Sequence, residues 1–260
     1  MSGMFFNVGE GIRELLIVGL VVAAAVGVHA YLQGRLSKRF SGQNEVAGYI
    51  FSAVGVIYAV LLGFVVVVVW EKYDTTVSNV DQEIASVSDL YRVAAGLPPK
   101  TEAAVRLDLR RYVVDMIDVE WPQMAQRVIV AADLDVIESM AHAIATVKPA
   151  DLGESNAQLR AMGQSARLFD ARRERLIESA PSVPVVLWFA LYTGAVAMLF
   201  FCYLFGVENR PTQLIMTAVL AALIGILFTV IDEFDSPFSG SVSISDAGWK
   251  ILAVHLPQIP

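Results

Sequence analysis

Long apolar runs alternate with polar stretches along this chain. Four runs match the roughly 20 residues that a helix needs to cross the hydrocarbon core of a bilayer. They are Leu15–Gln33, Tyr49–Trp70, Val185–Gly206 and Gln213–Ile231, and none contains Asp, Glu, Lys or Arg. We therefore predict four membrane-spanning helices.

The polar stretch between the second and third runs has helical periodicity. After Trp70 the pattern continues at heptad-like spacing and predicts an apolar seam of Val77, Val80, Ile84, Val87 and Tyr91. Further helices are predicted over residues 101–130, with a kink near Pro122, over 136–147 and over 156–179. The apolar side of the last one comprises Leu159, Met162, Ala166, Phe169, Arg173 and Leu176.

These patterns predict an all-α membrane protein with four transmembrane helices and a helical bundle inserted between the second and third. Residues 1–70 hold the first transmembrane pair, and residues 71–183 form a polar bundle continuous with the second helix. Residues 184–231 hold the second pair. Residues 232–260 form an acidic tail with a PFSG motif and a short amphipathic helix, which is a candidate for the membrane surface.

The second membrane helix carries small residues at spacings of three and four. This small-residue stripe consists of Gly48, Ser52, Gly55, Ala59 and Gly63. Small residues let helices approach closely in a membrane, so the stripe is typical of packing within one chain. In an oligomer it could instead line a path for ions. Both interpretations remain open from the sequence.

If the stripe lines a path, two bulky residues that follow it in the sequence, Phe64 and Trp70, are candidates for a hydrophobic constriction. Carboxylates follow at the end of the membrane segment, where Glu71, Asp74 and Asp81 would form an acidic collar. Such a collar would concentrate cations.

A second acidic group, Asp232, Glu233 and Asp235, follows the fourth membrane helix. The second and fourth helices are expected to leave the membrane on the same side. Carboxylate oxygens suit a divalent cation such as calcium, so these three residues are a candidate metal site. A solvated acidic border is the alternative, because no ligand loop of known spacing is present. No other cofactor is expected.

Composition narrows the possible functions. The chain is 56% hydrophobic with a mean hydropathy of +0.58, as expected for a protein embedded in the lipid bilayer. Its net charge of −7 argues against nucleic acid as a partner. No arrangement of Ser, His or Cys points to catalysis, so we do not expect an enzyme. The single cysteine, Cys202, excludes an intrachain disulfide.

Charges near the membrane segments give conflicting orientations. Arg35, Lys38, Arg39 and Arg210 lie in short loops, which favours cytoplasmic loops and an extracytoplasmic bundle in a bacterial inner membrane. Arg167, Arg172, Arg173 and Arg175 precede the third helix and favour the opposite side. From the short loops, we expect the bundle outside the cytoplasm.

Several motifs together resemble the bestrophin-like family of bacterial membrane proteins. They are VGVIYAVLLGFVVVVVWEKY, VDQEIASVSDLYR, EWP at 120–122, RRERL at 172–176 and DSPFSG at 235–240. The more distant resemblance to bestrophins implies a pentameric ion channel with the second helix lining the pore and a calcium clasp near the acidic tail. The sequence departs from that pattern, because Ser239 displaces the glycine of the tail motif and the long acidic string is absent.

We therefore expect a homo-oligomeric ion channel with the second helix lining a path for small inorganic ions, and cations favoured by the carboxylates. The alternative is a non-conducting membrane scaffold whose bundle binds a partner protein. A secondary transporter is a further alternative, weakened by the lack of charges at membrane depth.

Overall fold

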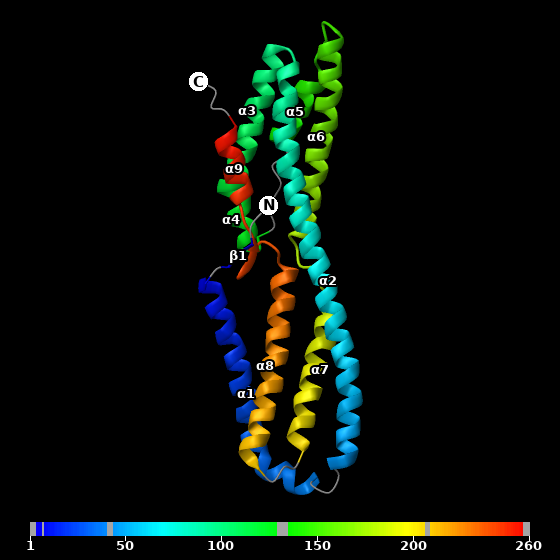
Figure 1. Ribbon diagram of the computed structural model, residues 1–260, viewed down its shortest axis with the longest axis vertical. Coiled ribbons are helices and arrows are strands. Elements are labelled where there is room, and N and C mark those ends of the chain that lie inside the picture. The colour runs from blue at the N-terminus through cyan, green and yellow to red at the C-terminus, as the bar shows by residue number, and fades with distance from the viewer. Residues whose placement is uncertain (1–3, 7, 41–43, 129–134, 206–208, 257–260) are drawn as a thin grey trace. The chain divides into compact units, whose positions relative to one another are not determined.

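The computed structural model describes residues 4–6, 8–40, 44–128, 135–205 and 209–256 (Figure 1). It divides into two compact units. The membrane unit comprises Asn7–Glu71 and Ser182–Asp235, and the bundle unit comprises Lys72–Pro181 with both ends of the chain, through Phe6 and from Ser236.

Four long apolar helices lie in the part of the membrane unit that the structure describes. They are α1 (Val8–Phe40), the first half of α2 (Asn44–Val93), α7 (Val185–Leu204) and α8 (Arg210–Asp235). Each is long and apolar enough to cross a membrane. The predicted fold class, an all-α membrane protein with four spanning helices and an inserted bundle, is confirmed.

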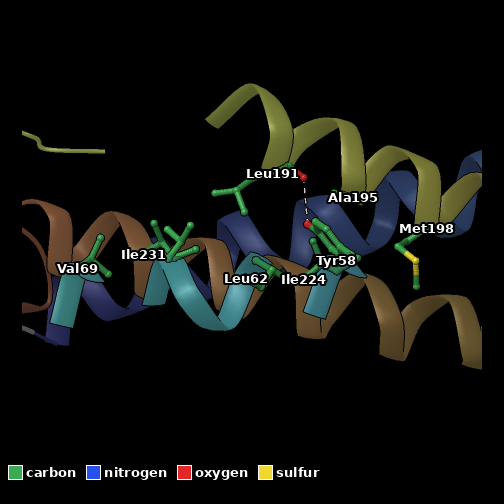
Figure 2. Packing of buried hydrophobic residues seen from close by; sticks show 9 residues of the cluster. Tyr58, Leu62, Val69, Leu191, Ala195, Met198, Ile224 and Ile231 are labelled. Carbon is green, nitrogen blue, oxygen red and sulfur yellow. Dashed lines mark hydrogen bonds between the residues drawn. The ribbon is translucent and has the colours of Figure 1, made fainter. Parts of the chain in front are cut away.

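A hydrophobic core joins α2, α7 and α8 within the membrane unit. One face of α2 contributes Tyr58, Leu62, Val65 and Val69, which meet Leu191 and Ile224 (Figure 2). The Tyr58 hydroxyl donates a hydrogen bond to the Leu191 carbonyl at 3.0 Å. Without that bond the buried hydroxyl would be costly, so the contact fixes α2 against α7.

Polar contacts also join the membrane helices. His29 of α1 is fully buried, and its Nδ1 lies 2.6 Å from the Thr217 hydroxyl of α8. The Tyr203 hydroxyl of α7 donates to the Ala25 carbonyl of α1 at 3.1 Å. Side chains that hydrogen-bond between helices hold membrane bundles together, so His29 has a structural role here.

The bundle unit is built around the second half of α2. Its other elements are β1 (Met4–Phe6), η2 (Ala94–Gly96), α3 (Pro99–Asp115), η3 (Met116–Glu120), α4 (Trp121–Ala125), α5 (Asp135–Ala145), α6 (Leu152–Glu178), β2 (Val242–Ile244) and α9 (Ala247–His255). β1 and β2 form a short antiparallel ribbon, which the sequence pattern did not predict.

The kink predicted near Pro122 coincides with a change of helix type. α3 runs into η3, a π-helical turn, and α4 begins directly after it with Pro122 in its first turn. Proline has no N–H to donate to the preceding turn, and the change from η3 to α4 comes at this point. The wider turn carries Glu120, which is buried.

The tail belongs to the bundle unit. α9 covers the predicted amphipathic helix, but its Trp249 is fully buried and packs at 5.9 Å from the Tyr112 ring of α3. The Trp121 indole donates to the Ile244 carbonyl at 3.2 Å, and its ring meets Phe238 edge-on. The inner face of α9 therefore lies in a protein core, where we had expected a membrane surface.

The buried faces of two bundle helices differ from the prediction. On α2, Val80, Val87 and Tyr91 are buried as expected, and Val77 and Ile84 are half-buried. Thr76, Glu83 and Leu90 are buried as well. On α6, the predicted apolar side was wrong. Leu159, Met162 and Phe169 are exposed, and the buried side is Ala161, Ser165, Leu168, Arg172 and Arg175.

The contact between α2 and α7 gives a testable prediction. A Cβ added at Gly194 would lie 2.3 Å from Cδ2 of Tyr58. Gly194→Ala should therefore force the ring out of place and destabilise the fold by about 1–3 kcal/mol. Thermal unfolding in detergent would measure the effect. Gly27→Ala is the control, because a Cβ there meets nothing within 4 Å. Equal unfolding temperatures for the two variants would contradict this packing.

Candidate functional site

The membrane half of α2 has a covered face and an open one. Tyr58, Leu62, Val65 and Val69 are at most 6% exposed, because they form the core. The small-residue stripe lies along the edge of this face. Ser52, Ala59 and Gly63 are exposed, whereas Gly48 and Gly55 are half-buried.

The chain's own helices cover little of the stripe. A Cβ added at Gly55 would meet the Met198 side chain of α7 at 3.3 Å, so close packing explains this glycine. A Cβ at Gly48 or Gly63 would meet nothing within 4 Å. The Ser52 hydroxyl donates to the Gly48 carbonyl within the same helix. Packing inside one chain therefore accounts for one member of the stripe.

The predicted constriction residues lie on different faces of α2. Trp70 is in phase with the stripe and meets Phe234 of α8 edge-on, with ring centroids 5.1 Å apart. Phe64 follows Gly63 directly, which places it about 100° further around the helix. Both side chains are partly exposed, at 65% for Phe64 and 48% for Trp70. The constriction stays a prediction.

The predicted collar residues Glu71, Asp74 and Asp81 are exposed on α2. The second acidic group differs. Glu233 and Asp235 are buried, and Asp235 accepts hydrogen bonds from the backbone N–H groups of Ser182 and Val183 at 2.7 and 3.2 Å. Asp235 thus anchors the chain just before α7.

Among the residues that the structure describes, no three His, Cys, Asp or Glu side chains gather to hold a metal ion. Asp232, Glu233 and Asp235 are included in that statement. A calcium site at these residues stays a prediction without supporting geometry.

The bundle unit contains a buried ion cluster that the sequence patterns did not reveal. Arg175 of α6 is fully buried and donates from Nε to Glu83 of α2 at 2.6 Å and from Nη2 to Glu120 of η3 at 2.8 Å. Arg172 donates to the other oxygen of Glu120, and the Tyr112 hydroxyl of α3 donates to Glu83. The ion cluster thus joins four helical segments.

Burial makes each charge in the ion cluster depend on the others. A buried carboxylate or guanidinium loses its hydration, so it is stable only with closely placed counter-charges and hydrogen bonds. Arg175 provides both, since its planar fork faces both oxygens of Glu83. The cluster is therefore expected to fix how α6 and η3 are rotated against α2.

The charges of the ion cluster shift the pKa values of Arg175 and Tyr112. Burial tends to lower the pKa of Arg175, but Glu83, Tyr112 and Glu120 outweigh it and raise that pKa. Burial and the Glu83 carboxylate raise the pKa of Tyr112 well above 10, although Arg175 and Arg172 oppose the shift. The guanidinium stays charged and the phenol stays protonated at neutral pH.

Three of the five motifs that carried the family resemblance meet in this cluster. Glu83 comes from VDQEIASVSDLYR, Glu120 from EWP, and Arg172 and Arg175 from RRERL. A family model described as a bestrophin-like domain matches residues 15–248. The chain belongs to the bestrophin-like family.

Solved structures of low sequence identity share the bestrophin-like fold. Two are crystal structures of a bacterial bestrophin homologue from Klebsiella pneumoniae carrying point mutations. They have TM-scores of 0.67, with 13% and 14% identity, and cover 92% and 95% of this chain and 97% and 98% of theirs. A third, the crystal structure of a membrane protein, has a TM-score of 0.62 and 16% identity and covers 94% of this chain and 96% of its own. No curated protein matches the chain.

The ion cluster predicts a large cost for removing its centre. Arg175→Met should leave Glu83 buried without its counter-charge and Glu120 with Arg172 as its remaining partner, and should destabilise the fold by about 3–5 kcal/mol. Denaturant unfolding followed by circular dichroism would measure the loss. The control is Arg92→Met, which removes an exposed ion pair with Asp89 and should cost less than about 1 kcal/mol. Similar losses for both variants would show that the cluster is not a buried unit.

The raised pKa of Tyr112 predicts how stability changes in alkali. Above pH 10 the unfolded chain releases the phenolic proton while the folded chain keeps it, so stability falls as pH rises. Tyr112→Phe removes this proton and should lose less stability than the wild type between pH 9 and 11. Unfolding midpoints across that range would test the sign. Parallel curves for the two proteins would contradict it.

Proposed function

We propose that this bestrophin-like chain is a subunit of an oligomeric ion channel in a bacterial inner membrane, with α2 lining the path. The observation that supports the proposal is the small-residue stripe. Three of its members, Ser52, Ala59 and Gly63, lie on the part of α2 that the chain's own helices leave uncovered. Uncovered small residues suit a close approach by identical helices or a path wide enough for ions.

The number of subunits in this proposal comes from the family resemblance, which implies five. A ring of identical subunits would bring one copy of each α2 toward a common axis. Trp70, which is in phase with the stripe, would then supply aromatic bulk toward the Glu71 end of the path, where a hydrophobic constriction can gate by expelling water. Phe64, about 100° further around the helix, would add bulk at the side of the path.

We propose cations as the preferred ions. Glu71, Asp74 and Asp81 are exposed and follow the apolar part of the same helix. A ring of subunits would multiply these carboxylates around one mouth, which raises the local concentration of cations. We also propose, from the charges of the short loops, that the bundle lies outside the cytoplasm.

Reconstitution gives a direct test of the channel. Purified protein in planar bilayers should carry current, and the reversal potential under a KCl gradient should lie toward that of K⁺. Gly63→Leu should reduce the current by about tenfold or more, because the leucine would narrow the path. The control is Gly19→Leu on α1, since a Cβ at either glycine meets nothing within 4 Å.

Two results would contradict this proposal. The absence of current in every salt and calcium condition would argue against any channel. Equal loss of current in both leucine variants would argue against α2 as the lining helix.

The second candidate function, a non-conducting scaffold, has one observation in its favour. A groove of about 420 Å³ lies between α5 and α6 in the bundle unit, lined by apolar residues that include Ile144, Met162 and Phe169. Exposed apolar grooves on polar domains are typical of protein-binding surfaces. A protein that carries no current but binds a partner helix through this groove would support the scaffold.

A further inference from the structure

A second groove, of about 370 Å³, lies inside the membrane unit between α1, α7 and α8. Its body is apolar and is lined by residues such as Val18, Val21, Val196, Leu199 and Ile224. The volume is in the range of small-ligand sites. Because all three helices are apolar enough to span a membrane, the natural occupant of such a body is hydrocarbon.

One end of the groove is charged. Arg13 and Glu14 come from the start of α1, and Asp232 and Glu233 come from the end of α8. These residues flank the apolar spans, at the depth where a lipid headgroup lies. The polar end of the groove therefore matches the headgroup of a phospholipid, and its apolar body matches an acyl chain.

Aromatic residues mark the boundary between the two parts. Trp188 and Tyr192 stack in the first turns of α7 with ring centroids 5.6 Å apart, and Phe228 of α8 meets Tyr192 edge-on at 5.2 Å. All three line the groove. Trp and Tyr concentrate at the interface between hydrocarbon and headgroups, which supports this placement of the polar end.

The charges at the polar end identify the kind of headgroup. Three carboxylates and one guanidinium line the groove there, and Arg13 forms an ion pair with Glu10 at 2.9 Å. A purely anionic headgroup would be repelled by this excess of negative charge. A headgroup that carries both a phosphate and a cation can pair with Arg13 and with the carboxylates.

The cation is further defined by its hydrogen bonds. A primary ammonium has three N–H donors, and a carboxylate offers several acceptor positions, so one carboxylate can accept from more than one donor. A quaternary choline has no N–H to donate. We propose that this groove binds phosphatidylethanolamine, with one acyl chain between α1, α7 and α8 and its ammonium at the carboxylates.

Lipid binding can be measured on the full chain without any flux assay. The purified protein is freed of lipid in mild detergent with EDTA present and titrated with dioleoyl phosphatidylethanolamine, phosphatidylcholine or phosphatidylglycerol. Native mass spectrometry then counts the bound lipid. We expect phosphatidylethanolamine to bind about tenfold more tightly than phosphatidylcholine, since charge-assisted hydrogen bonds are lost with the latter.

Two sets of variants, each with its control, separate the apolar body of the groove from its polar end. Val196→Trp should fill the apolar body and reduce binding of every lipid, whereas Val219→Trp, an exposed position on α8 outside the groove, should not. Asp232→Asn and Glu14→Gln should remove the preference for phosphatidylethanolamine over phosphatidylcholine. Glu45→Gln, at the start of α2, should keep it.

Three outcomes would overturn the proposal. They are equal affinity of the wild type for the ethanolamine and choline lipids, tighter binding of phosphatidylglycerol than of both, and undiminished binding in Val196→Trp.

Discussion

The bundle unit depends on one buried guanidinium. Arg175 has no exposed surface, and water cannot hydrate its charge. Glu83 and Glu120 must therefore lie within hydrogen-bonding distance of it, which determines the rotation of α6 and η3 against α2. Hydrophobic packing alone would tolerate several rotations of a helix, but a buried charge tolerates few.

This constraint explains other features of the bundle. Glu120 lies in the π-helical turn, whose extra residue per turn shifts the side chains that follow it. Trp121, the next residue, meets Phe238 and the Ile244 carbonyl of the tail. Tyr112, which donates to Glu83, packs against Trp249 of α9. The tail and the ion cluster therefore share neighbours, and the family motifs of the bundle converge on one core.

The helices of the membrane unit associate for a different reason. Lipid is as apolar as their side chains, so burial of apolar surface does not drive them together. The helices meet through close packing at Gly194 and Gly225 and through hydrogen bonds from Tyr58, His29 and Tyr203. Such packing covers one face of α2 and leaves the rest of its membrane half uncovered by the chain's own helices. The proposed ion path and the proposed lipid groove both use surfaces that this packing leaves open.

The sequence alone determined the membrane helices and the continuous helix α2. Uncharged runs such as Tyr49–Trp70 have few alternatives to spanning a bilayer, since every backbone group must be satisfied within the helix. It also predicted an unbroken α2, because no proline interrupts residues 44–93.

The tertiary structure decided which helix faces are buried. Along α6, apolar periodicity favoured the side with Leu159, Met162 and Phe169, but the buried side carries Arg172 and Arg175. The sequence does not distinguish a charged residue that is buried with its counter-ion from one that is exposed to solvent. The counter-ions of Arg175 lie 92 and 55 residues away, and only folding brings them within reach.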